Sequence, residues 1–100
     1  MSGRLGQPKL FDQAVRAQQR GESATAESLY LRLLKKMPTF APAWVNLGQL
    51  RRQNGDEAGA IESYQQALKL PNPPIELHFN LANLYLWHLY TSDASDEAHR

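Results

Sequence analysis

The sequence predicts an all-α fold, a solenoid in which helix-turn-helix units stack side by side. Residues 41–74 carry apolar residues at helical spacing on both sides of an Asn-Gly-Asp break. The same pattern recurs, without a gap, when this segment is laid over the preceding one with Trp44 above Leu10, and it begins again after residue 74. We therefore expect a flexible N-terminus (1–7), two full units (8–40 and 41–74) and the first helix of an incomplete third (75–88).

The central unit defines the pattern of large and small residues. Trp44, Leu47 and Gly48 lie at the spacing of one helix face, and Gly55 interrupts the helix. Small residues let two helix backbones approach closely, while large residues fill the spaces beside them. The residues expected to form the core of this unit are Trp44, Leu47, Gly48, Gly55, Ala60, Tyr64 and Ala67.

The neighbouring segments repeat this order of residues. Shifting back by one unit places Ala14 under Gly48 and Tyr30 under Tyr64. In the first unit the expected core residues are Leu10, Ala14, Gly21, Ala26 and Tyr30. Shifting forward by one unit gives Leu81, Ala82 and Tyr85, after which the register fails near Leu86.

The residues Trp44-x-x-Leu47-Gly48, Gly55-Asp56, Ala60, Tyr64 and Ala67 resemble the tetratricopeptide repeat, a family with one helix-turn-helix per unit. The resemblance implies a helical superhelix, here a truncated fragment of a larger repeat protein. It also implies a concave groove, lined by the first helix of each unit, that binds peptides or partner helices. The groove candidates that it implies are Phe11, Val15, Val45, Asn46, Gln49, Arg52, Phe79, Asn80 and Asn83.

Asn46 and Asn80 stand one repeat apart, and a carboxamide both donates and accepts hydrogen bonds. They are similar to the asparagine ladder of O-linked N-acetylglucosamine transferases, although asparagine is also a common family choice there and Asp12 breaks the series. The resemblance thus implies a protein-protein interaction scaffold. The alternative is the N-terminal arm of a larger bacterial enzyme, a sulfotransferase or glycosyltransferase.

Composition and motifs argue against several other functions. The net charge of +1 gives no reason to expect nucleic-acid or membrane binding, and the absence of cysteine is compatible with a reducing, cytoplasmic location. His78 and His88 fall on different helix faces, and no catalytic motif is present. We expect no enzyme activity in these residues, no cofactor and no metal. Arg16, Arg20, Arg51 and Arg52 form either a basic strip for acidic partners or a solvated, charge-balanced helix face.

Residues 89–100 are expected to form an irregular tail. Their sequence resembles a peptide that arises where sequencing-adapter DNA has been translated, which would make the tail non-native. The alternative is the diverged start of the second helix of the third unit. In either case the helix over 75–88 lacks its usual cover, so self-association through that helix is expected.

Overall fold

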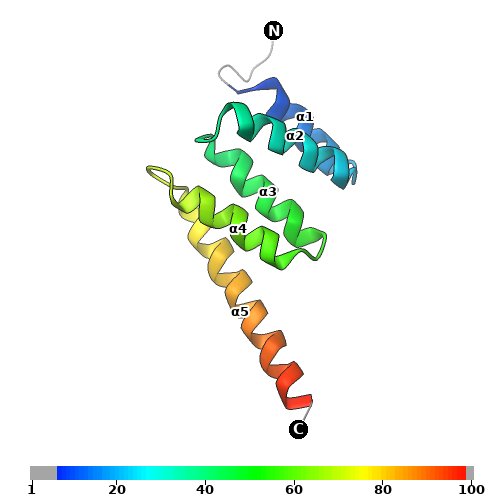
Figure 1. The fold of residues 1–100 in the computed structure, drawn as a ribbon, viewed down its shortest axis with the longest axis vertical. Coiled ribbons are helices and arrows are strands. Elements are labelled where there is room, and N and C mark those ends of the chain that lie inside the picture. Colours follow the sequence, from blue (N-terminus) through cyan, green and yellow to red (C-terminus); the bar gives the residue numbers. More distant parts are fainter. Residues whose placement is uncertain (1–6, 99–100) are drawn as a thin grey trace.

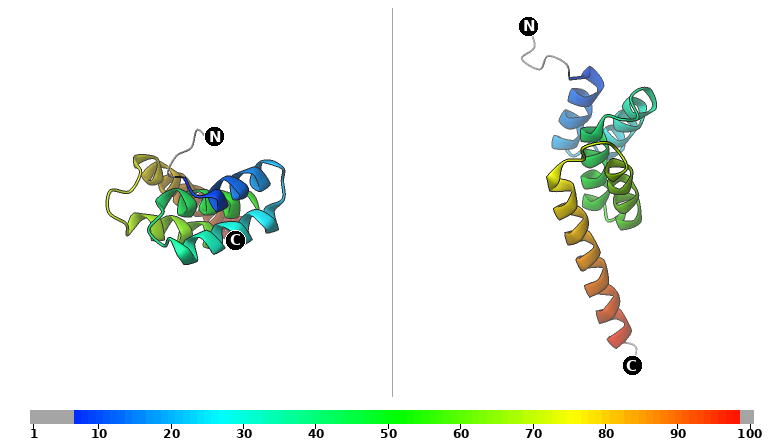
Figure 2. Two further views of the ribbon diagram at one scale, coloured as in Figure 1. Left: turned by 90° about the horizontal axis from the view of Figure 1, so that it is seen from above. Right: turned by 90° about the vertical axis from the view of Figure 1, so that its left-hand side faces the viewer.

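The computed structural model describes residues 7–98, and within them it contains helices and no strand. The helices α1 and α2 form one antiparallel pair and α3 and α4 a second pair stacked on the first, which confirms the all-α helical repeat fold (Figure 1). The fifth helix begins beside α4 and continues past the stack, as two further views show (Figure 2). The bounds are α1 Lys9–Gln19, α2 Ser23–Lys36, α3 Ala41–Gln53, α4 Glu57–Leu68 and α5 Ile75–Ala98.

The turns within the two pairs have the same geometry. Gly21 and Gly55, which are equivalent residues of the two units, adopt φ angles of 79° and 83°, which a side chain would disfavour. The amide that follows each glycine donates to the carbonyl five positions back, at 2.9 and 2.8 Å. Both bonds belong to the Schellman motif that ends a helix at glycine. The two glycines are exposed turn residues, so they shape the repeat without belonging to its core.

The interior consists of two clusters that meet at α3. Leu47 and Leu50 pack with α1 and α2, whereas Leu81 and Leu84 pack with α4 in the second cluster. These two pairs are one repeat apart, so α5 rests on α4 in the same way that α3 rests on α2. Gly48 lies against the ring of Tyr64, whose Cε1 would be 2.5 Å from a Cβ added at the glycine.

The third unit differs from the sequence-based expectation. Ala82 and Tyr85 were predicted to lie in the core, but both are exposed, Tyr85 by 42%. Their counterparts in the central unit, Gly48 and Arg51, contact α4. Among the described residues no second helix follows α5, so Ala82 and Tyr85 lack the helix that packs on Gly48 and Arg51, although the Tyr85 hydroxyl accepts a hydrogen bond from Gln65 of α4 at 3.0 Å.

The expected boundary at residue 88 and the irregular tail over 89–100 are also wrong, because α5 continues to Ala98. Residues 75–98 contain neither glycine nor proline, the two strongest helix breakers. The expected flexible N-terminus lies, except for Gln7, outside the described residues, as do residues 99 and 100 of the tail. Over the described part of the chain, no helix is both long and apolar enough to cross a membrane.

Candidate functional site

Two adjoining hollows lie between the first helices of successive units, α3 and α5. One has a volume of about 420 Å³ and the other about 350 Å³, and Gln49 and Asn80 line both. We call the combined space the α3–α5 hollow. Its lining residues are Pro42, Val45, Asn46, Gln49, Arg52, Gln53, Tyr64, Pro74, Glu76 and Asn80.

Five of the groove candidates line this hollow, namely Val45, Asn46, Gln49, Arg52 and Asn80. All of them lie on first helices, as the repeat resemblance implies. The α3–α5 hollow therefore brings together the candidates from the second unit with one from the third.

The other four candidates lie elsewhere. Phe11 was expected in the groove but is only 6% exposed, because its ring packs against Tyr30 and Phe40 at centroid distances of 6.2 and 5.3 Å. Val15 lines a separate hollow of about 90 Å³ on α1. Phe79 and Asn83 are exposed on α5 and line neither part of the α3–α5 hollow, since no further first helix follows α5 in the described chain.

A buried tyrosine, Tyr30, lies next to Asn46. The Tyr30 ring is fully buried, and its hydroxyl donates a hydrogen bond to Gln18 Oε1 at 2.6 Å. Burial raises the pKa of Tyr30, and a hydrogen bond between its hydroxyl and the Asn46 side chain opposes the rise. The tyrosine thus joins α1 and α2 through its hydroxyl and lies next to Asn46 of α3.

The same arrangement recurs one unit later. Shifting Gln18, Tyr30 and Asn46 by one repeat gives Arg52, Tyr64 and Asn80, which all line the larger part of the α3–α5 hollow. Burial raises the pKa of Tyr64, and the positive charge of Arg52 opposes the rise. Sequence reasoning assigned both tyrosines to the core alone. Each tyrosine has an asparagine sixteen positions later in the sequence, and this repeated spacing was the signal that could have placed both tyrosines beside the groove candidates.

The arginines do not form a continuous basic strip. Arg51 donates to Glu27 Oε2 at 3.2 Å and to the buried Ser63 hydroxyl at 2.8 Å, so its charge is used between α2, α3 and α4. Arg20 pairs with Glu22 at 3.4 Å. These pairings favour the charge-balanced interpretation of the basic residues.

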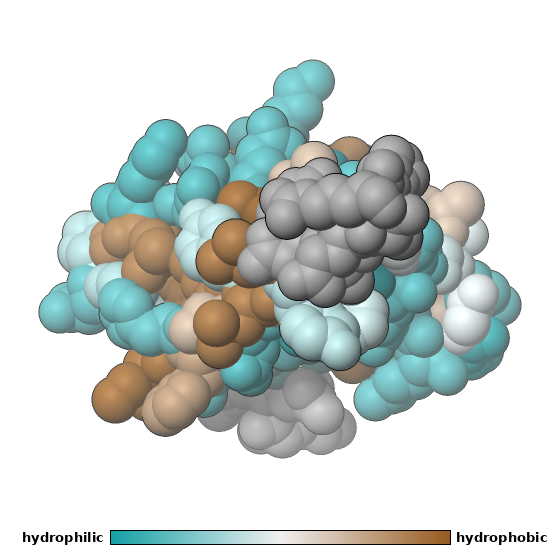
Figure 3. Space-filling view, turned by 90° about the horizontal axis from the view of Figure 1, so that it is seen from below, coloured by the Kyte–Doolittle hydropathy of each residue, from teal (hydrophilic) through white to brown (hydrophobic). Residues whose placement is uncertain are grey.

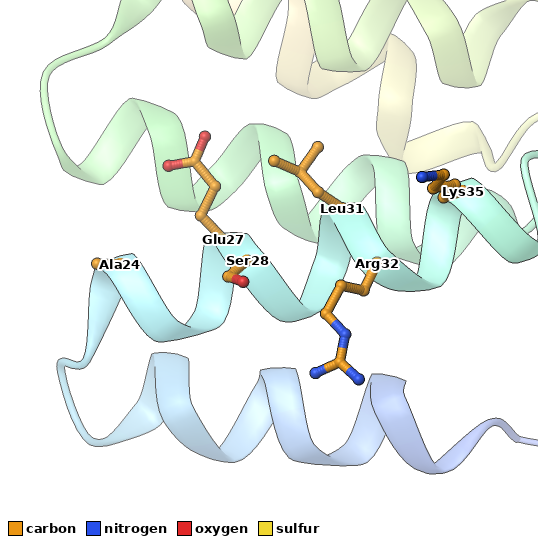
Figure 4. Close-up of a pocket in the computed structure, with 6 residues that line it drawn as sticks. All are labelled: Ala24, Glu27, Ser28, Leu31, Arg32 and Lys35. Atoms are coloured by element: carbon orange, nitrogen blue, oxygen red, sulfur yellow. The ribbon is translucent and has the colours of Figure 1, made fainter.

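A third hollow, of about 480 Å³, lies along α2 alone (Figure 4). Figure 4 shows Glu27 and Leu31 on one side of the helix and Arg32 on the other. Because one helix supplies all six of its lining residues, the hollow has one wall and would enclose little of a ligand. It is a weaker candidate than the α3–α5 hollow.

The described residues contain no group of three or more His, Cys, Asp or Glu side chains placed to hold a metal ion. His78 is exposed on α5 and lines neither part of the α3–α5 hollow. The chemistry available in the hollow is hydrogen bonding by carboxamides, one cation and one carboxylate, with apolar contact from valine and proline.

Comparison with known proteins agrees with the repeat geometry. The family model described as TPR repeat matches residues 48–86. The chain is also similar to tetratricopeptide repeat protein 36 of Bos taurus, with 39% identity over 67 residues. The similar region is 66% of this chain and 36% of the bovine protein, so the chain spans little more than a third of that relative.

These matches, together with the repeated turns and the tyrosine-glycine contact, support a protein of the tetratricopeptide repeat family. Repeats of this family generally mediate protein-protein interaction, and the family is generally non-catalytic.

Proposed function

We propose that this protein is an interaction scaffold that binds an extended peptide or a partner helix in the α3–α5 hollow. The observation that carries the proposal is the placement of Asn46 and Asn80, one repeat apart, beside the same cavity, which Gln49 also lines. Each carboxamide can donate one hydrogen bond and accept another. Such groups match the alternating donors and acceptors of a peptide backbone whatever its side chains.

The two parts of the hollow carry opposite charges, which favours one orientation of a bound peptide. Arg52 is the one charged residue lining the larger part of the described cavity, and Glu76 is the one lining the smaller part. Val45, Pro42 and Pro74 beside Glu76 offer apolar contact. The ligand that fits is a peptide with an acidic group near Arg52, and with a basic group and a small apolar side chain near Glu76.

The first test measures affinity for peptides selected on an array against the intact chain. Asn80→Ala should weaken binding about 5-fold, and with Asn46→Ala about 30-fold, for a net cost of about 1 kcal/mol per carboxamide removed. Asn83→Ala is the matched control, because Asn83 is the same residue type on the same helix but outside the hollow. Equal affinity of the double variant and the control, with helical circular dichroism intact, would remove the proposal.

A second test uses the charge direction. Arg52→Glu should shift selection on the same array from peptides with an acidic residue at that end to peptides with a basic one. Arg32→Glu on α2 is the control, since Arg32 lies outside the α3–α5 hollow. If Arg32→Glu changes the charge of the selected peptides and Arg52→Glu does not, the ligand binds on α2 and the proposal is wrong.

A further inference from the structure

Large apolar side chains are exposed along α5. Of the described residues outside α5, only Leu31 and Met37 are large, hydrophobic and exposed, whereas α5 has seven such residues. The most exposed include Ile75 at 71% and Phe79 at 70%. Figure 3 views the molecule from its C-terminal end and shows hydrophobic residues gathered on one side of it.

Five α5 residues follow the spacing of a coiled coil. Successive separations of four, three, four and three positions relate Ile75, Phe79, Ala82, Leu86 and Leu89, and all five are exposed. We call these residues the α5 seam. This heptad spacing places them on one helix face, where a second helix can insert its own side chains. At about 100° per residue, the seam lies on the side of α5 away from Leu77 and Leu84, which pack on α4.

We propose that the α5 seam is a dimerisation surface that pairs with the α5 seam of a second copy of this chain. Its central position, Ala82, is small and lets two helix backbones approach closely, while the larger residues on both sides interdigitate. Glu76 is the only Asp, Glu, Lys or Arg residue between positions 75 and 90, and the chain has a net charge of +1. Two copies therefore meet with little electrostatic repulsion along the seam.

The other exposed end of the stack does not suit the seam. The α3 residues Ala43, Leu47 and Leu50 are buried where α3 rests on the preceding pair. Their counterparts on α1, one repeat earlier, are Lys9, Gln13 and Arg16, and none of these is buried. A head-to-tail contact would bury two cations against apolar side chains, which is costly. A symmetric contact between two seams has no such cost.

The helix dipole sets the orientation of the pair. In a parallel pair the two α5 dipoles would point the same way, with like ends together. In an antiparallel pair the positive N-terminal end of each α5 lies toward the negative C-terminal end of the other, which is favourable. The pair is therefore antiparallel, with its two-fold axis at Ala82.

The area available suits a weak dimer. Large aromatic and aliphatic side chains each offer on the order of 150–250 Å², so the exposed fractions of the seam residues and Tyr90 amount to roughly 600 Å² per copy. Two copies would bury about 1,200 Å², the lower end of the range for specific interfaces. A dissociation constant in the micromolar range is expected.

The dimer is independent of ligand binding in the α3–α5 hollow. Asn80 lies about two fifths of a turn around α5 from the centre of the seam, at about 100° per residue. The seam is identified by exposure and heptad spacing, and the hollow by its lining carboxamides. Failure of one proposal leaves the other standing.

Sedimentation velocity from about 1 to 200 µM tests the pairing. The wild-type chain should convert from monomer to dimer over this range, and Leu86→Glu should raise the dissociation constant at least about 100-fold. Leu31→Glu is the matched control, an exposed leucine on α2 that should leave the dimer unchanged. A wild-type monomer at the highest concentration would overturn the proposal and would leave the seam as a site for a different helix. A dimer that persists with Leu86→Glu would also overturn it.

Disulfide trapping tests the orientation, and the chain offers no cysteine of its own. Ala82→Cys should give a covalent dimer on mild oxidation, because the two-fold axis brings both copies of this residue together. Ile75→Cys alone should not, but it should crosslink when mixed with Leu89→Cys. A parallel pair would crosslink Ile75→Cys with itself, which would overturn the antiparallel arrangement.

Discussion

Replacing Gly48 with alanine tests the contact on which the packing of α3 against α4 depends. A Cβ at Gly48 would lie 2.5, 2.7 and 2.9 Å from three atoms of the Tyr64 ring. Comfortable carbon-carbon contacts are about 3.5–4.0 Å, so the new methyl group overlaps the ring by about 1 Å. Tyr64 is 1% exposed and cannot swing into solvent without leaving the core.

Two effects of Gly48→Ala oppose each other. Alanine stabilises a helix interior by about 1 kcal/mol relative to glycine. Overpacking of a filled core costs about 1–3 kcal/mol, and a ring between two helices has little room to move. The two terms differ by about 0–2 kcal/mol, and the confined ring favours the upper half of that range. We expect a net loss of about 1–2 kcal/mol in the free energy of unfolding, or roughly 5–15 °C in Tm, measured by urea and thermal denaturation.

The reverse change in the first unit is the matched control. Ala14 occupies the position of Gly48 and is fully buried. Ala14→Gly loses helix propensity and a buried methyl group, so it should also destabilise, by about 1–2 kcal/mol. Stabilisation by Gly48→Ala would mean that Tyr64 does not pack on the glycine, and the reasoning would be refuted.

Other consequences follow from the buried polar groups. Tyr30→Phe removes a hydroxyl bonded at 2.6 Å and should cost about 1 kcal/mol in urea unfolding. Burial raises the folded-state pKa of Tyr30 and Tyr64 above the ordinary value of 10.0, so the folded protein keeps protons that the unfolded chain loses. Stability should therefore be constant with respect to these groups below about pH 10 and fall above it, and a double Tyr→Phe variant should lose this fall. Arg51→Met leaves the buried Ser63 without a donor at 2.8 Å and should cost about 1–2 kcal/mol, measured by urea unfolding at neutral pH.

The sequence predicted the fold wherever two units could be compared. Three features recur at one spacing: glycine at the turn, a small residue on the first helix and tyrosine on the second. In the structure the turn glycines adopt positive φ angles, and Gly48 packs against the Tyr64 ring. Prediction failed for Ala82, Tyr85 and the tail. The expected burial of Ala82 and Tyr85 required a neighbouring helix, and the amino-acid pattern of α5 itself does not say whether that helix is present. The irregular tail was expected from a resemblance that does not bear on helix formation.

The groove could be predicted only in part. Register predicted that Asn46 and Asn80 share a helix face, because a shift of one whole repeat preserves that face, and both residues line the α3–α5 hollow. Their role in ligand binding stays a prediction. Phe11 was misplaced because its position was taken from the family pattern, whereas its large ring is more stable against Tyr30 and Phe40 than in water. The interaction between the Tyr30 hydroxyl and the Asn46 side chain depends on the length and direction of both side chains, which the spacing of residues in the sequence does not give.

The most direct test of the proposed binding site is a ¹H-¹⁵N nuclear magnetic resonance titration of the chain with an array-selected peptide, following side-chain amide signals. The largest shifts are expected at the carboxamides of Asn46, Gln49 and Asn80, which line the α3–α5 hollow. Unchanged carboxamide signals, with the largest backbone shifts at Ser28 and Leu31 on α2, would contradict it.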